Sequence, residues 1–136
     1  MTNATGSKFT LHYVEESTYG TTPATPTWTP LCVTAVNLGL SKDTIEDQCL
    51  RADRQVEDVR HGNKQVSGDV TSRLSYGDFD DMLEAMAMGT WASDVLKTGV
   101  TRRSFTFEKY YDIATDEYHR ATGCEVNTMS LSVQPN

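Results

Sequence analysis

Residues 66–89 constrain the fold most, because a period of two changes there to the period of an α-helix. From position 66 to position 76 alternate residues fall on two sides of the chain. One side carries Val66, Gly68, Val70, Ser72, Leu74 and Tyr76. The other side is polar throughout. An apolar side and a polar side in strict alternation are typical of a half-buried β-strand.

A helix is predicted directly after Gly77. The apolar residues there have the spacing of one helix face. They are Phe79, Met82, Leu83 and Met86. Asp78 is placed to cap the first turn with its carboxylate, and Gly89 is a typical left-handed stop. The apolar face of this helix requires a sheet to cover it.

Length and charge exclude several classes of protein. The chain has 136 residues and a formal net charge of −7, which predicts one domain and argues against tight binding of nucleic acid. No apolar run approaches the ~20 residues that span a bilayer, and no signal sequence is recognisable, so we expect cytoplasmic synthesis and no membrane contact. Cys32, Cys49 and Cys124 are far apart and odd in number, which predicts free, semi-buried thiols.

The N-terminal part of the chain is predicted to be a strand followed by an arm. Residues 8–14 alternate as a strand does. Residues 15–30 contain three prolines and many threonines, which excludes a helix and argues against a central strand. We interpret them as an extended arm carrying Tyr19 and Trp28. The two rings either dock on a neighbouring molecule or cap the edge of the chain's own core.

The rest of the chain favours an antiparallel sheet. Strands are predicted at 31–40, more weakly at 44–50, and at 102–110, 117–121 and 124–133, with a turn at 112–116 and a bend at Gly123. Residues 53–63 are highly charged and form a loop or hairpin tip, with Gly62-Asn63 as a turn signal. Residues 90–100 connect the helix to the next strand, with Trp91 and Leu96 against the core. The prediction is a mainly β domain of roughly six to eight antiparallel strands, a sandwich or barrel flanked by one helix.

The sequence offers little that could support catalysis. His12, His61 and His119 have no metal-ligand spacing and are expected at the surface. There is no nucleophile elbow and no phosphate-binding glycine loop. Adjacent acids on a strand point to opposite faces, so they do not form a shared carboxylate site. We therefore expect no enzyme, no cofactor and no metal.

Six segments, in this order and spacing, resemble one family. They are E-S-T-Y-G-T-T-P-A-T-P (16–26), R-A-D-R (51–54), V-S-G-D-V-T (66–71), Y-G-D-F-D-D-M-L-E-A-M (76–86), S-F-T-F-E-K (104–109) and G-C-E-V-N-T-M-S-L-S (123–132). Together they resemble the tail tube proteins of long-tailed bacteriophages, in the type that has an E-x-x-Y-G-T-x-P arm near its start. The resemblance covers about residues 8–133.

The resemblance implies a structural virion protein of the phage tail, assembled in the host cytoplasm. Six tail tube folds are expected to form a ring, and stacked rings form the conduit for genome delivery. The implied partners are other copies of the chain, the tape measure protein, and the tail terminator and distal tail or baseplate proteins. DNA would pass through the lumen without specific binding. Members with this arm are usually longer, so the native chain is expected either to be compact or to continue past Asn136.

Charge and composition suggest which residues serve these roles. A net-acidic lumen would keep DNA phosphates from sticking. The candidates for the lumen are Asp43, Glu46, Asp47, Asp69 and Glu125; an ordinary solvated face is the alternative. The arm and the charged 53–63 segment are the parts least able to fold on themselves, so they are candidates for contacts between subunits and between rings. The candidate interface residues are Tyr19, Trp28, Arg51, Asp53, Arg54, Glu57, Asp58 and Arg60.

Two other functions stay open from the sequence. A tail-completion or neck protein of the same fold would stop at a single ring. A small β-sandwich carbohydrate-binding module would use Tyr19, Trp28 and Trp91 to stack on sugars.

Overall fold

The structure is a computed structural model of the chain, and it describes residues 9–46, 59–112 and 115–133. Contacts divide the chain into two compact units, Ala35–Thr71 and the remainder. The larger unit holds a four-stranded sheet, the helix and a short hairpin, and the smaller unit is a long hairpin. The described part of the chain is therefore mainly β with one helix, as the sequence predicts.

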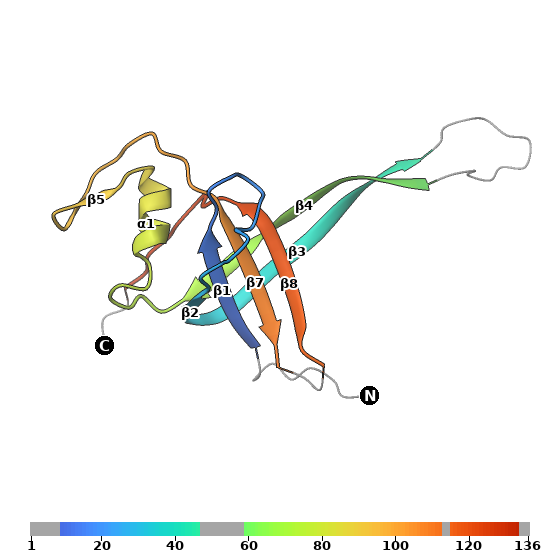
Figure 1. Cartoon of the computed structure of the whole chain (residues 1–136), viewed down its shortest axis with the longest axis horizontal. Helices are drawn as coiled ribbons and strands as arrows, with labels where there is room; N and C mark the ends of the chain where they lie inside the picture. The colour runs from blue at the N-terminus through green and yellow to red at the C-terminus, as the bar shows by residue number, and fades with distance from the viewer. Residues whose placement is uncertain (1–8, 47–58, 113–114, 134–136) are drawn as a thin grey trace, which may run out of the picture. The chain divides into compact units, whose positions relative to one another are not determined.

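The four-stranded sheet has the order β2-β1-β7-β8, with every neighbouring pair antiparallel (Figure 1). The strands are β1 (Phe9–Glu15), β2 (Thr29–Leu31), β7 (Phe105–Tyr111) and β8 (Glu117–Cys124). β2 contains Pro30 and lies at the edge of the sheet, where a residue without an N–H is tolerated. The strand predicted at 8–14, the strand predicted at 102–110 and the returning strand after the turn are confirmed.

Strand β7 is central and is buried on both of its faces. Phe105 is fully buried on the face that carries Leu11 and Tyr13 of β1. Thr106 and Glu108 point to the opposite face and are also buried. The sequence shows the alternation of apolar and polar residues on β7, and the structure shows that the polar face also belongs to the core.

Helix α1 (Asp80–Ala87) follows the turn after β4 but begins later than predicted. Phe79 occupies the N-terminal cap position without a side-chain hydrogen bond. Asp78, predicted as the cap, instead accepts a hydrogen bond from the Ser75 hydroxyl. The buried residues of this short helix are Met82 and Ala85, and Met86 of the predicted stripe is 44 % exposed.

The helix ends with a left-handed residue, as predicted, although that residue is not the predicted glycine. Met88 has φ 50°, and its N–H and the N–H of Gly89 donate to the carbonyls of Ala85 and Glu84. This is the Schellman pattern. Gly89 serves a different purpose, because a Cβ there would lie 1.9 Å from the carbonyl oxygen of Lys97.

The predicted connection at 90–100 contains a small hairpin, β5 (Trp91–Ala92) and β6 (Val95–Leu96). Ser93 and Asp94 form its two-residue turn with φ values of 49° and 61°, which matches the twist of antiparallel strands. Trp91 packs along α1, donating its indole N–H to the Asp80 carbonyl at 3.3 Å, but it is 37 % exposed.

The smaller unit contains most of β3 (Val33–Glu46) and of β4 (Val59–Ser72), which pair with each other. The sequence predicts two separate strands at 31–40 and 44–50, whereas β3 is one continuous strand. The Gly62-Asn63 turn signal is wrong, because both residues lie inside β4. Gly62 is a cross-strand neighbour there, and a Cβ on it would meet the side chain of Asp43 at 3.2 Å.

Strand β4 ends four residues before the predicted position. Residues 73–79 form the turn that leads into α1, so Leu74 and Tyr76 are exposed instead of half-buried. The predicted alternation holds earlier in the strand, where Val66 and Val70 are half-buried among exposed neighbours.

The predicted last strand at 124–133 is wrong. Gly123 has φ +67° at an irregularity in the β7–β8 pairing, so the predicted bend is confirmed. Beyond this irregularity Cys124 still pairs with Phe105, the first residue of β7, and β8 stops there. Residues 125–133 form no strand, and Met129, Leu131 and Val133 are exposed.

The cysteines and histidines follow the predictions only in part. Cys124 is half-buried and free, whereas Cys32 is free but exposed; Cys49 lies outside the described residues. His61 and His119 are exposed as expected, although His61 lies in β4 and not in a turn, and His12 is half-buried. Among the described residues no group of three potential ligands could hold a metal ion.

Candidate functional site

A single buried carboxylate fixes the arm onto the sheet. Glu16, the first residue after β1, is 8 % exposed and accepts four hydrogen bonds. The hydroxyls of Ser104 and Thr106 donate at 2.7 Å each. The backbone N–H groups of Gly20 and Gly123 donate at 2.7 Å and 2.9 Å. One side chain therefore ties together the arm, the central strand and the end of β8.

Two turns place the backbone donors of this cluster. Thr18 and Thr21 form an isolated bridge, which folds the arm back and lets Gly20 adopt φ +72°. Gly123 adopts φ +67° at the irregular end of β8. Both values lie in the left-handed region that glycine occupies without strain. The Thr22 hydroxyl lies 3.1 Å from that of Thr106 and adds a second contact between the arm and β7.

The environment of Glu16 favours its charged form. Burial by itself raises the pKa of the Glu16 carboxyl, but the four hydrogen bonds together lower the pKa below its ordinary value. Hydrogen bonds to a carboxylate act in this direction because they stabilise the anion. The same burial, with the Glu16 charge nearby, raises the pKa of the Cys124 thiol.

The two arm aromatics differ in their surroundings. Trp28 is half-buried, with the guanidinium of Arg120 on β8 5.3 Å from its ring centre. Arg120 in turn bonds the buried carboxylate of Glu108. Tyr19 is 70 % exposed. Trp28 therefore caps the chain's own sheet, one of the two predicted roles, and Tyr19 keeps most of its ring in solvent.

The three candidate sugar-stacking rings do not share one surface. Trp91 bonds Asp80 and Glu84 of α1, and α1 contacts Tyr13 on the face of the sheet that carries Phe105 and Phe107. Trp28 lies over Arg120, on the opposite face with Glu108. A joint platform of Trp28 and Trp91 is therefore not formed.

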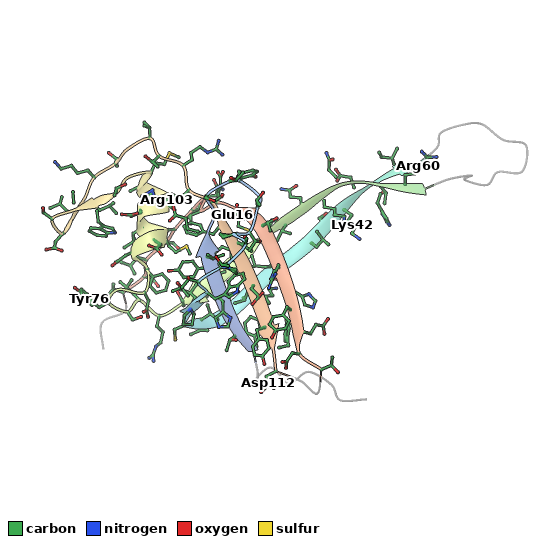
Figure 2. All side chains as sticks on the ribbon, in the orientation of Figure 1. Glu16, Lys42, Arg60, Tyr76, Arg103 and Asp112 are labelled. Atoms are coloured by element: carbon green, nitrogen blue, oxygen red, sulfur yellow. The ribbon has the colours of Figure 1, made fainter. Side chains whose placement is uncertain are left out.

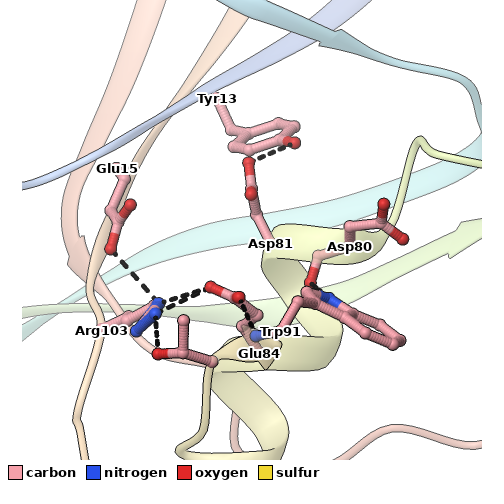
Figure 3. Close-up of polar contacts among 8 residues, drawn as sticks. Tyr13, Glu15, Asp80, Asp81, Glu84, Trp91 and Arg103 are labelled. Carbon is pink, nitrogen blue, oxygen red and sulfur yellow. Dashed lines mark hydrogen bonds and ion pairs between the residues drawn. The ribbon is translucent and has the colours of Figure 1, made fainter. Parts of the chain in front are cut away.

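Arg103 joins the helix to the sheet, as Figure 3 shows. Its guanidinium contacts the Glu84 carboxylate at 2.7 Å and the Glu15 carboxylate at 3.4 Å, and donates to the Thr90 hydroxyl at 2.9 Å. The Arg103 and Glu84 side chains are only 12 % and 15 % exposed. The second oxygen of Glu84 accepts the backbone N–H of Trp91 at 2.7 Å. This pair therefore holds α1 and the β5–β6 hairpin against the end of β7.

Tyr13 makes a second contact between the sheet and α1. Its hydroxyl donates to the Asp81 carboxylate at 3.0 Å, and burial together with the Asp81 charge raises the pKa of the phenol. We expect Tyr13→Phe to lower the free energy of unfolding by about 1 kcal/mol, the usual net value of one such hydrogen bond. Urea unfolding would measure this loss, and an unchanged midpoint would contradict it.

The β3–β4 hairpin has the properties of an assembly surface. Each strand has 14 residues, and no described side chain of residues 35–45 and 60–71 is buried. Leu40 and Ile45 are 58 % and 63 % exposed. Figure 2 labels Lys42 on β3 and Arg60 on β4 and shows side chains along the whole described length of both strands. The outer edges of β3 and β4 pair with no other described strand, and such edges accept further strands.

The predicted site residues are dispersed over the two units. Of the proposed lumen acids, Asp43 and Asp69 are exposed on the hairpin, Glu46 ends β3, and Glu125 pairs with Arg102 at 2.7 Å in the larger unit. Of the proposed interface residues, Arg60 is exposed on β4. The remaining predicted residues lie outside the described part of the chain. They are Asp47, Arg51, Asp53, Arg54, Glu57 and Asp58.

Comparison with known proteins identifies the family of this chain. A sequence model described as phage tail tube protein matches residues 6–136. The chain belongs to the phage tail tube protein family. A comparison with curated proteins finds no match. The family resemblance drawn from the six sequence segments is therefore confirmed.

Family membership makes this tail tube protein a structural component of the phage tail, where subunits contact one another and other tail proteins. Among the described residues no helix is long and apolar enough to cross a membrane.

Sequence reasoning did not identify Glu16 and Arg103 as organising residues. Glu16 is the first residue of the E-x-x-Y-G-T-x-P arm. Its spacing of four residues to Gly20, whose N–H it accepts, was the sequence feature that could have indicated its role. Arg103 carried no such signal, because the adjacent Arg102 has the same chemistry and is exposed instead.

Proposed function

We propose that this tail tube protein assembles with copies of itself into stacked hexameric rings that conduct the genome. The observation that carries the proposal is the β3–β4 hairpin. At about 3.4 Å per residue, strands of this length reach about 45 Å. A two-stranded hairpin alone is marginally stable in water. Neighbouring subunits that pair with its open edges would provide the missing stabilisation.

Family and charge support the finer parts of the proposal. The tape measure protein would lie inside the tube during assembly in the host cytoplasm, and the terminator and distal tail or baseplate proteins would close the two ends. With a net charge of −7, the tube would repel the phosphates of passing DNA. Asp43 and Asp69, exposed on the hairpin, are two of the described candidates for this lumen.

Negative-stain electron microscopy over a range of protein concentrations tests the proposal. Hollow tubes with a pore of about 20 Å or more, wide enough for a duplex with grooves of ~12 Å and ~6 Å, are expected. Single rings that never stack would favour a completion or neck protein. Small particles at every concentration would contradict self-assembly.

A pair of glycine variants tests the role of the hairpin. A Cβ at Gly68 would lie 1.7 Å from the carbonyl oxygen of Asn37, whereas a Cβ at Gly39 meets nothing within 4 Å. We expect Gly68→Ala to distort the strand pairing and abolish tubes, and Gly39→Ala to form tubes normally. The Tm of the larger unit should stay unchanged in both variants. Normal tubes from Gly68→Ala would contradict an assembly role for the hairpin.

A further inference from the structure

The segment 127–133 pairs with no strand among the described residues. In the part of the chain that the structure describes, residues 126–133 belong to no strand and make no hydrogen bond. The segment nevertheless has the pattern of a strand. Met129, Leu131 and Val133 alternate with Ser130 and Ser132, and they are 37 %, 69 % and 82 % exposed. An apolar row of period two is expected to lie on one face of a sheet.

The segment does not pair with its own neighbouring strand. After Cys124 the chain turns toward α1, where Val126 lines the same small pocket as Ala85 and Met88. Figure 1 shows the trace running from the end of β8 past the helix. Among the described strands, the outer edge of β8 therefore pairs with none.

The β8 edge is the better of the two edges of this sheet for accepting a strand. The opposite edge, β2, has three residues, and Pro30 among them has no N–H to donate. β8 has a regular stretch from Glu117 to Ala121 before its irregular end, which the seven residues of the segment can span.

The segment can match β8 at Ala121 and Arg120, near the end of the regular stretch. Ala121 pairs with Phe107 on the face that also carries Glu117 and His119 of β8, whereas Arg120 lies beside Glu108 on the opposite face, which also carries Tyr118. An added strand could place its apolar residues beside Ala121 and its serines beside Arg120. Cross-strand neighbours of matching polarity stabilise a sheet.

We propose that residues 127–133 add as a strand to the β8 edge of a second copy of this chain. The inference rests on the proposed self-assembly and names one contact that it uses. Main-chain hydrogen bonds would supply the affinity, and the alternating side chains would set the register.

Cysteine cross-linking between two variants tests the proposal. Both variants carry Cys32→Ser, Cys49→Ser and Cys124→Ala. The first variant carries a tag that changes its mass and also carries His119→Cys. Position 119 lies on the same face of β8 as Ala121. The other carries a cysteine at position 129, 131 or 133. After assembly and oxidation, a disulfide-linked heterodimer is expected for at least one of the three positions, because neighbouring strands bring Cβ atoms within disulfide reach.

Matched controls separate this contact from others. Ser130→Cys and Ser132→Cys place the thiol on the opposite face and should give roughly tenfold less heterodimer. Equal yields at serine and apolar positions would overturn strand addition. A heterodimer through Lys42→Cys in place of His119→Cys would make the hairpin the acceptor and overturn the proposal. Tubes without any cross-link contradict this inference alone, and a parent chain that forms neither rings nor tubes contradicts the proposed function as well.

Discussion

Glu16→Ala is expected to lower the free energy of unfolding by about 3 kcal/mol, which corresponds to a fall in Tm of roughly 10 °C. The substitution leaves four donors facing the space that the carboxylate occupied, two of them hydroxyls and two backbone N–H groups. Each buried donor without an acceptor has a desolvation cost. Water that enters the space would accept some of these hydrogen bonds, so the expected loss of stability is well below the sum of four full desolvation costs.

The neighbouring glutamate provides the control for this prediction. The Glu15 side chain is 52 % exposed and reaches Arg103 at 3.4 Å. An exposed ion pair contributes little to stability, so Glu15→Ala should shift the unfolding midpoint far less than Glu16→Ala. Equal shifts for the two variants would mean that the buried cluster contributes no more than an ordinary surface pair.

The charge of Glu16 makes its contribution depend on pH. Its pKa in the folded chain lies below the ordinary value of 4.5, so the unfolded chain binds a proton more readily. The stabilisation is therefore complete above the unfolded pKa and is lost as the pH falls through the folded pKa. We expect the difference in Tm between the parent chain and Glu16→Gln to shrink as the pH falls below 4.5. A constant difference would contradict the charged state of Glu16.

Much of the fold could be predicted from periodicity. The alternation in β7 and the apolar spacing around Met82 reflect local geometry, which the sequence contains directly. Element ends were less predictable, because they depend on contacts that are distant in sequence. β8 ends at Cys124, which pairs with Phe105, the first residue of β7, so the rest of the 124–133 alternation finds no partner in β7.

The organising contacts were harder to predict than the elements. Glu16 lies 88 positions from Ser104 and 107 from Gly123, and no local pattern connects residues so far apart. The sequence assigned the prolines and threonines of 15–30 to an arm, but it could not show that one carboxylate fixes that arm. Exposed residues of the hairpin keep their predicted assembly roles as proposals, because their partners would come from another subunit.

Arg103→Ala is the second large expected effect, a loss of about 3 kcal/mol in the free energy of unfolding. Removing the guanidinium leaves the Glu84 carboxylate, 15 % exposed, without its cation. A largely buried charge without a partner is strongly destabilising. Because Glu84 also accepts the backbone N–H of Trp91, the loss should loosen the β5–β6 hairpin as well as α1.

The adjacent arginine, Arg102, provides the control for this prediction. Arg102 pairs with Glu125 at a similar distance, 2.7 Å, but its side chain is 72 % exposed. Solvent and salt screen such a pair, so Arg102→Ala should leave the Tm nearly unchanged. Tryptophan fluorescence adds a local measurement, since Trp91 rests on α1 and should become more exposed only in Arg103→Ala. Equal losses of stability in the two variants would show that burial does not determine how much these ion pairs stabilise the chain. They would also show that the contact of Arg103 with Glu84 does not hold the helix to the sheet.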